Sequence, residues 1–270
     1  MPLPKRMLGQ VSYTCQMMRN TKDSVPELIR FSLVTVVIYF ALQTIVVIAH
    51  EYAHSIAAWL LGYTATPLTV VWGNPITIRG WDEGVPYDQV FRSPGHPAEA
   101  VIGGIPLFMH AVFTLLGLYL LQRRLPTRRK LIFYAVYLFV VVNLTELIAY
   151  ILMRPFAGSG DTGRFNEGLR ISPWPLFVVG TVLLALAFGV LVRRVMPRLD
   201  QIVGGSRSKH WIVVCFTGFV MFLWGSGLRI MSLYPDRQWK WGLAGVFAFL
   251  AWIATGARTP SPGVGSEIRP

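Results

Sequence analysis

Long apolar segments alternate with short polar connections along most of this chain, and this pattern determines the expected fold class. A helix of about 20 mostly apolar residues crosses the roughly 30 Å hydrocarbon core of a bilayer. Six segments reach or approach that length: residues 31–61, 98–121, 131–153, 173–192, 211–234 and 241–257. The pattern therefore predicts an all-α integral membrane protein with about six transmembrane helices, of which the last two form a tight helical hairpin.

The polar segment between the first two predicted helices has a different pattern. Residues 69–71 and 76–78 are Thr, Val and Ile, which favour extended backbone. Gly73, Asn74 and Pro75 lie between them and favour a turn. The pattern predicts a small β-hairpin at the membrane surface, with an irregular loop as the alternative.

The same spacing predicts how the chain is organised. We expect residues 1–30 to form a cytoplasmic N-terminal segment, residues 31–172 a three-helix core and residues 173–257 a set of accessory transmembrane helices. Residues 258–270 are rich in Pro, Gly and Ser and are expected to be disordered. The first apolar segment is too long for the apolar region of a cleaved signal peptide, so we expect it to remain as a transmembrane helix.

Composition and charge agree with a membrane protein. Charged residues make up 14% of the chain and hydrophobic residues 53%, whereas about 25% of residues in a soluble domain are charged. The formal net charge is +12, but the basic residues cluster between apolar segments, which is typical of membrane topology. We therefore expect lipid headgroups rather than nucleic acid as their partner. Most basic residues fall on one predicted side of the membrane, which predicts that both termini are cytoplasmic.

The first predicted helix contains the motif that carries chemistry, His50-Glu51-Tyr52-Ala53-His54. Residues i and i+4 lie on one face of a helix, so both imidazoles can reach one metal ion. Zinc accepts imidazole nitrogen, and the adjacent Glu51 is placed to act as the general base of a hydrolase rather than as a ligand. Ionisable groups inside a membrane are costly unless they are paired, ligating or facing water. The alternative interpretation is a polar cluster that only connects helices by hydrogen bonds.

A catalytic zinc needs a third protein ligand, for which the sequence offers two candidates. Asp161 follows the third predicted helix, on the same side of the membrane as His54, and the glycines around it let the backbone bend inward. Glu146 lies within the third predicted helix. It is either a rival ligand or a carboxylate that supports His50 or His54.

Two further polar residues occur in predicted transmembrane helices. Asn143 is a candidate for binding the substrate backbone or for packing helices together. His110 follows Gly103-Gly104-Ile105-Pro106, and is either a supporting polar contact or a ligand. The small residues before it permit close approach of another helix.

These features together resemble the site-2 protease family of intramembrane zinc metalloproteases. The resemblance rests on the His50–His54 motif in a membrane helix, on Gly104-Ile105-Pro106 in the next helix, and on Asn143, Pro155 and Asp161 further along. It implies two His ligands, one Asp ligand, a general-base Glu, and hydrolysis of peptide bonds in membrane protein substrates, as in regulated intramembrane proteolysis. Thr162 follows Asp161 where the family has Gly, and Ile105 separates Gly104 from Pro106, which indicates a divergent branch.

Two alternatives from other classes remain at this point. One is a different membrane zinc hydrolase in which Glu146 is the third ligand. The other is a non-catalytic membrane scaffold that retains a metal site, although metal binding alone does not require Glu51.

Overall fold

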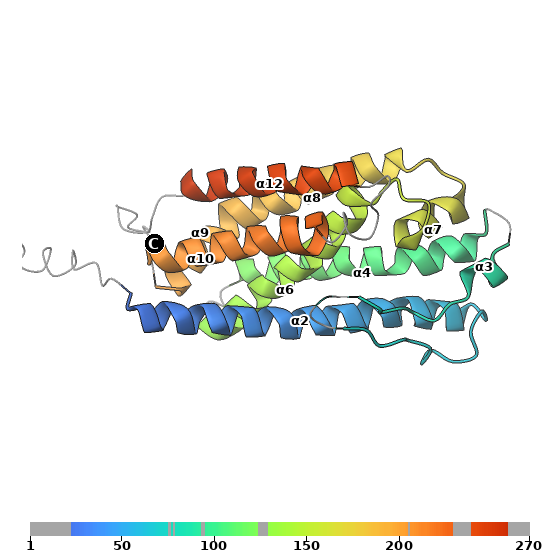
Figure 1. Ribbon diagram of the computed structural model, residues 1–270, viewed down its shortest axis with the longest axis horizontal. Helices are drawn as coiled ribbons and strands as arrows, with labels where there is room; N and C mark the ends of the chain where they lie inside the picture. The colour runs from blue at the N-terminus through green and yellow to red at the C-terminus, as the bar shows by residue number, and fades with distance from the viewer. Residues whose placement is uncertain are drawn as a thin grey trace, which may run out of the picture.

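The computed structural model describes residues 23–74, 77, 79–92, 95–123, 129–204, 206–228 and 239–258. Most of its helices run along the long axis of the molecule (Figure 1). In chain order they are α2 (Val25–Leu60), α3 (Tyr87–Val90), α4 (Pro97–Gln122), α6 (Lys130–Ile148), η1 (Ala149–Met153), α7 (Gly160–Leu169), α8 (Trp174–Val190), η2 (Leu191–Val195), α9 (Met196–Ile202), α10 (Arg207–Gly218), η3 (Phe219–Leu228) and α12 (Trp239–Arg258). The three η segments are π-helical turns that continue the α-helices before them.

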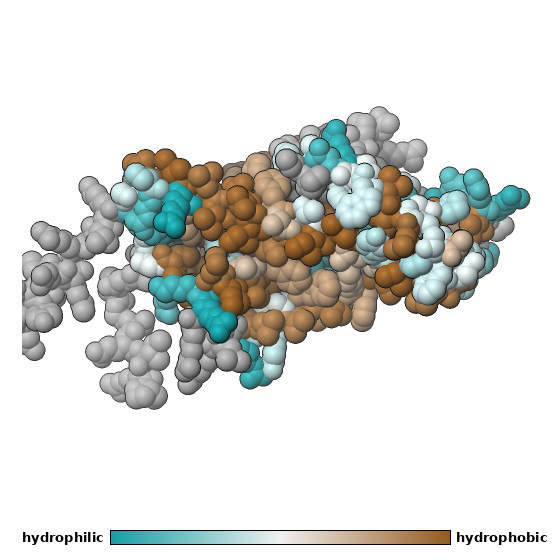
Figure 2. Space-filling model, turned by 90° about the horizontal axis from the view of Figure 1, so that it is seen from below, coloured by the Kyte–Doolittle hydropathy of each residue, from teal (hydrophilic) through white to brown (hydrophobic). Residues whose placement is uncertain are grey.

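Five of the described helical segments are long and apolar enough to cross a membrane: Val25–Leu60, Pro97–Gln122, Lys130–Leu152, Trp174–Ile202 and Arg207–Gly225. On the face seen in Figure 2, apolar side chains cover much of the middle, while hydrophilic ones gather mainly toward the two ends. These features support the predicted all-α membrane protein. The sixth predicted helix corresponds to α12, in which the apolar stretch Leu243–Gly256 is shorter than the others. The count of six is therefore not confirmed, and the predicted connection at residues 235–240 lies mostly outside the described residues.

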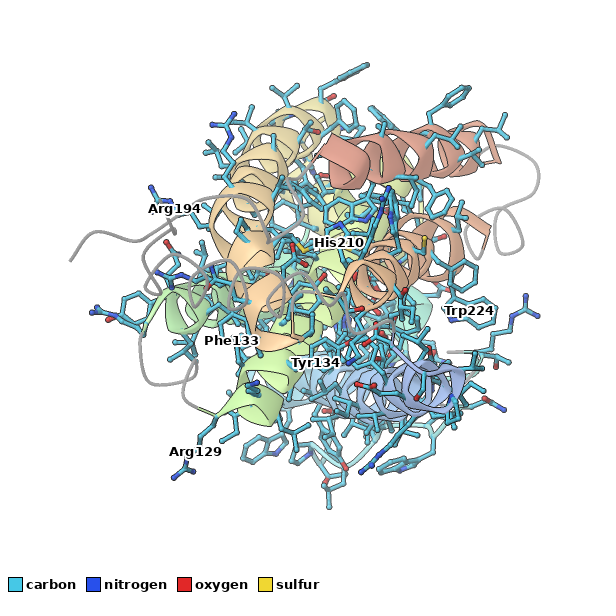
Figure 3. The ribbon with its side chains drawn as sticks, turned by 90° about the vertical axis from the view of Figure 1, so that its left-hand side faces the viewer. Arg129, Phe133, Tyr134, Arg194, His210 and Trp224 are labelled. Atoms are coloured by element: carbon cyan, nitrogen blue, oxygen red, sulfur yellow. The ribbon has the colours of Figure 1, made fainter. Side chains whose placement is uncertain are left out.

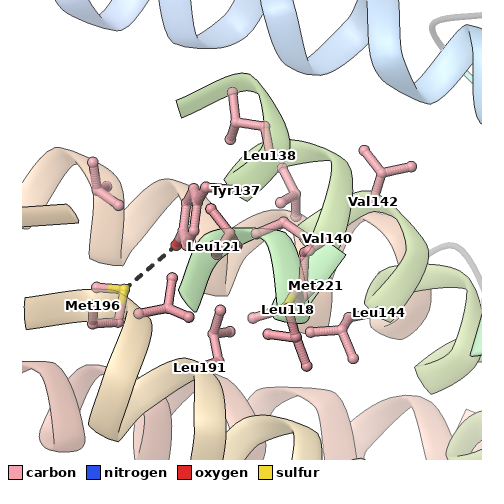
Figure 4. Packing of buried hydrophobic residues seen from close by; sticks show 14 of the residues in the cluster. Leu118, Leu121, Tyr137, Leu138, Val140, Val142, Leu144, Leu191, Met196 and Met221 are labelled. Carbon is pink, nitrogen blue, oxygen red and sulfur yellow. Dashed lines mark hydrogen bonds between the residues drawn. The ribbon is translucent and has the colours of Figure 1, made fainter. Parts of the chain in front are cut away.

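Helix α6 occupies the centre of the bundle. It packs against α2, α4, α8 and η3, and the side chains of Phe133, Tyr137 and Leu144 are fully buried. Figure 4 shows this apolar packing, including the hydrogen bond that the Tyr137 hydroxyl donates to Met196 Sδ, at 3.6 Å. By contrast, α8 exposes Val178, Val182 and other large apolar side chains, as expected for a helix that faces lipid.

Helix α2 begins and α12 ends at the same end of the molecule (Figure 1). Figure 3 looks onto this end and shows Arg129 and Arg194 pointing outward. Lys209 pairs there with Asp23, at 3.2 Å, and with Glu27, which ties the start of α10 to the start of α2. The pKa of Asp23 is lowered by its hydrogen bond with Ser206 and by Lys209. The predicted N-terminal segment and C-terminal tail lie almost entirely outside the described residues.

The segment between α2 and α4 contains two isolated antiparallel bridges, Val71 with Asp82 and Asn74 with Arg79. No strand is present in the part of the chain that the structure describes, so the predicted β-hairpin is not confirmed; residue 75 of its predicted turn and residues 76 and 78 of its second extended segment lie outside that part. This segment, residues 62–95, is tied to α2, because Ser55 donates a hydrogen bond to the Pro67 carbonyl oxygen at 2.8 Å and contacts Thr69 Oγ1 at 2.7 Å.

Helix α7 packs closely against the beginning of α4, and glycines make this approach possible. A Cβ atom at Gly103 would lie 2.9 Å from the Asp161 carbonyl oxygen and 2.9 Å from Arg164 Cβ. Arg164 of α7 also pairs with the buried Glu99 of α4 and with Asp88 of α3, each at 3.0 Å. Burial opposes the charge of this guanidinium, but the two hydrogen bonds raise the pKa of Arg164 above its usual value.

The close approach at Gly103 gives a testable prediction. Gly103→Ala places a methyl group against the backbone of α7, which cannot move aside like a flexible side chain, so we expect a loss of about 1–3 kcal/mol in unfolding free energy. Thermal unfolding of the purified protein measures this change. The matched control is Gly189→Ala in α8, where an added Cβ meets no atom within 4 Å and the better helix propensity of Ala adds stability. Equal unfolding temperatures for Gly103→Ala and wild type would contradict the packing role of Gly103.

Candidate metal centre

His50 and His54 lie on one face of α2, one helical turn apart, and both side chains are buried. Their Nε2 atoms approach each other to 3.3 Å. The i and i+4 spacing in a continuous helix produces this arrangement, as the sequence predicts. The site lies in the half of α2 nearer to Leu60, about 15 Å from that end at 1.5 Å per residue.

The other ring nitrogen of each histidine has a partner on α4. His54 Nδ1 lies 2.7 Å from the carbonyl oxygen of Ile102, and His50 Nδ1 lies 2.9 Å from Nε2 of His110. A carbonyl oxygen only accepts, so His54 Nδ1 carries the hydrogen. In a neutral ring this leaves the lone pair on His54 Nε2, the atom that faces His50.

Asp161 brings the third donor atom from the first turn of α7. Its Oδ2 lies 3.0 Å from His50 Nε2 and 3.3 Å from His54 Nε2. Burial alone would raise the pKa of this carboxyl group, but the facing imidazoles of His54 and His50, when they carry a proton on Nε2, hold it well below its usual value. The Asp161 carboxylate is mostly shielded from solvent and faces two imidazole nitrogens.

His50, His54 and Asp161 form a group in which one ligand atom from each residue lies within 4.8 Å of the others, as required to hold a metal ion. Zinc ligands bind at about 2.0–2.1 Å with tetrahedral angles, which places neighbouring ligand atoms about 3.3–3.4 Å apart. The three observed separations, 3.0, 3.3 and 3.3 Å, are close to that value. Asp161 Oδ2 is buried and accepts no hydrogen bond. Two imidazoles and a carboxylate suit zinc and other first-row transition metals.

A cavity of about 160 Å³ opens beside this group. It exceeds the roughly 10–15 Å³ that one water molecule requires. Its lining residues are Val47, His50, Glu51, Trp81, Glu83, Glu146, Tyr150, Arg154 and Asp161. The carboxylate of Glu51 thus lines the same space, large enough for water, as the candidate ligands His50 and Asp161.

Glu146 lines the same cavity but does not belong to the converging group. Its Oε1 accepts a hydrogen bond from Gln43 Nε2 at 3.0 Å, and Gln43 Oε1 in turn accepts one from the Tyr39 hydroxyl at 3.1 Å. This geometry favours Asp161 over Glu146 as the third ligand and gives Glu146 a position beside the site.

His110 and Asn143 lie behind His50 and do not line the cavity. Both side chains are fully buried, and His110 Nδ1 lies 2.9 Å from Asn143 Oδ1. Of the alternatives that the sequence leaves open for these residues, the geometry favours supporting roles over direct contact with a substrate.

Tyr150, Arg154 and two residues of the 62–95 segment line the cavity although the sequence analysis did not identify them. The Tyr150 ring stacks on His50 with centroids 5.5 Å apart, and its hydroxyl lies 3.3 Å from His50 Nε2. The Arg154 guanidinium lies over the Tyr150 ring at 4.0 Å. The spacing of Glu146, Tyr150 and Arg154 was the available signal, since each follows the last by four residues. Trp81 and Glu83 had no comparable signal.

Comparison of the chain with protein-family profiles, with curated proteins and with solved structures finds no match.

Proposed function

We propose that this protein is a membrane-embedded zinc metallopeptidase that hydrolyses peptide bonds in transmembrane or membrane-adjacent segments of other proteins. The convergence of His50, His54 and Asp161 beside Glu51 is the observation that carries the proposal. A general-base carboxylate next to such a group is the arrangement of zinc peptidases. The resemblance to the site-2 protease family, as a divergent branch, supports the same function.

The residues of the site have separate roles in the proposed reaction. His50, His54 and Asp161 would hold the zinc ion, which when bound would supply Lewis acidity toward the scissile carbonyl group. Glu51 accepts the proton of the attacking water and passes it to the leaving amine. Glu51 lines the cavity beside His50, which supports its role in this proton transfer.

The 62–95 segment is the proposed contact for the substrate backbone. Trp81 and Glu83 from this segment line the cavity, and the two antiparallel bridges at Val71 and Asn74 hold its two arms together. A substrate in extended conformation can pair with exposed backbone groups of such an element with little demand on its sequence. A helical substrate has to unwind locally first, because its amide groups are engaged in helical hydrogen bonds.

Two alternatives keep a metal at this position. A membrane zinc hydrolase with Glu146 as third ligand is favoured by one observation, the presence of Glu146 on the cavity wall. A non-catalytic scaffold would bind the metal but would not need the carboxylate of Glu51. Substitutions at Glu51, Asp161 and Glu146 separate these functions.

Glu51→Gln tests the catalytic proposal. Because Gln cannot accept the proton, we expect zinc content to stay at about one ion per chain while cleavage falls by roughly 100-fold or more. The measurements are zinc content and cleavage of a single-span membrane peptide reconstituted with the purified protein. Wild type with zinc and no activity toward a panel of such peptides would favour the scaffold, and equal activity of variant and wild type would contradict the role of Glu51.

Asp161→Asn and Glu146→Gln identify the third ligand. We expect Asp161→Asn to weaken zinc binding by more than the roughly 10–100-fold that loss of an outer hydrogen-bond partner costs. Glu146→Gln is expected to bind zinc nearly as wild type does, because its side chain is engaged by Gln43 rather than by the converging group. Competition with a chelator measures both affinities. The opposite ranking would support the hydrolase in which Glu146 is the ligand.

The basic end of the molecule is proposed to face the cytoplasm, with both termini on that side. The test uses single cysteines in a background without Cys15 and Cys215, at the exposed positions Gln89 and Arg194. Membrane-impermeant maleimide added to intact cells is expected to label Gln89→Cys and not Arg194→Cys until the membrane is opened. Labelling of Arg194→Cys alone in intact cells would reverse the orientation.

A further inference from the structure

A row of buried polar groups leads from α6 through α4 to His50. His110 Nε2 lies 2.9 Å from His50 Nδ1, and His110 Nδ1 lies 2.9 Å from Asn143 Oδ1. Asn143 Nδ2 continues the row to the carbonyl oxygen of Phe139 at 2.8 Å. The side chains of His110 and Asn143 have no exposed surface, so water cannot replace these partners.

The row has a fixed direction because it ends on a carbonyl oxygen. The Phe139 carbonyl only accepts, so the amide of Asn143 directs its NH₂ group to Phe139 and its oxygen to His110. The oxygen accepts in turn, which places the hydrogen of His110 on Nδ1. In a neutral ring, His110 Nε2 then has a lone pair and accepts a hydrogen bond from His50 Nδ1.

This direction determines the state of His50. With its hydrogen on Nδ1, the lone pair of the neutral ring is on Nε2, which lies 3.0 Å from Asp161 Oδ2 and 3.3 Å from His54 Nε2. His54 reaches the same state by a different route, through the Ile102 carbonyl oxygen. Both candidate histidine ligands are therefore oriented by α4, His54 through the Ile102 backbone and His50 through the His110 side chain.

We propose that His110, oriented by Asn143, is a positioning residue that fixes the tautomer and ring orientation of His50 for metal binding. The inference rests on the proposed metal site at His50, His54 and Asp161. Metal-bound histidines commonly donate their second ring N–H to an acceptor. A neutral imidazole serves as that acceptor here, and it acts only because Asn143 holds its hydrogen on the far nitrogen.

The test compares three substitutions in α4 of the full-length protein. His110→Leu removes the acceptor, and His110→Gln retains a side-chain oxygen that can accept from His50 Nδ1. The control Thr114→Val changes a buried hydroxyl one turn away that has no hydrogen-bond partner. Zinc affinity by chelator competition and the visible absorption of the cobalt-loaded protein are measured for each.

We expect His110→Leu to weaken zinc binding by about 10–100-fold and to change the cobalt absorption bands. His110→Gln is expected to bind within a few-fold of wild type, and Thr114→Val to match wild type in both measurements. Wild-type affinity and spectrum in His110→Leu would overturn the inference while leaving the metal site intact. Equal weakening in the Leu and Gln variants would also overturn it, because the acceptor would then not be what matters. Absence of metal binding in wild type would overturn the proposed metal site itself.

A second measurement does not depend on a folded Leu variant. Nitrogen-15 NMR of zinc-loaded wild type labelled at histidine reports which ring nitrogen carries hydrogen, and the resonances lost in His110→Gln belong to His110. We expect His110 with a protonated Nδ1 and an unprotonated Nε2. A protonated Nε2 on His110 would overturn the proposed direction of the row.

Discussion

The structure depends on one electrostatic constraint, the convergence of three electron-rich atoms inside an apolar helical bundle. His50 Nε2, His54 Nε2 and Asp161 Oδ2 lie within 3.0–3.3 Å of each other. Lone pairs at such separations repel one another unless a proton or a metal ion lies between them, and the low dielectric of a protein interior strengthens that repulsion. The surrounding contacts must therefore hold the three groups in place, and a bound cation would convert this repulsion into attraction.

Helix α4 supplies most of those contacts. Its glycine face lets α7 approach closely enough to deliver Asp161, and Glu99 fixes α7 by pairing with Arg164. The Ile102 carbonyl oxygen orients His54, and His110 contacts His50. A helix that contains none of the three converging residues thus fixes the position or orientation of each.

The sequence predicted the parts of this site that depend on local geometry. His50 and His54 meet because helical spacing alone brings residues i and i+4 together. Asp161 was predicted as the third ligand because it lies on the same predicted side of the membrane as His54 and is flanked by glycines. The partners of these residues depend on contacts between residues far apart in the chain, such as His110 with Asn143, 33 positions apart. The helical periodicity of the sequence does not indicate that α7 packs against Gly103. The β-hairpin predicted from residues 69–78 is not confirmed: among the described residues of the segment, backbone pairing is limited to the isolated bridges of Val71 with Asp82 and of Asn74 with Arg79.

The proposed hydrolysis requires water beside the metal, and the cavity is lined by polar groups that can hold water. Glu51, Glu83, Glu146 and Arg154 line the cavity, and ionisable groups at such a depth are tolerated when they face water or one another. The same side chains that would be costly against lipid therefore line a space large enough for water, while α8 exposes Val178 and Val182. The polarity of the cavity and the apolarity of the outer helices are thus two parts of one arrangement, in which protein alone separates a polar cavity from the apolar exterior.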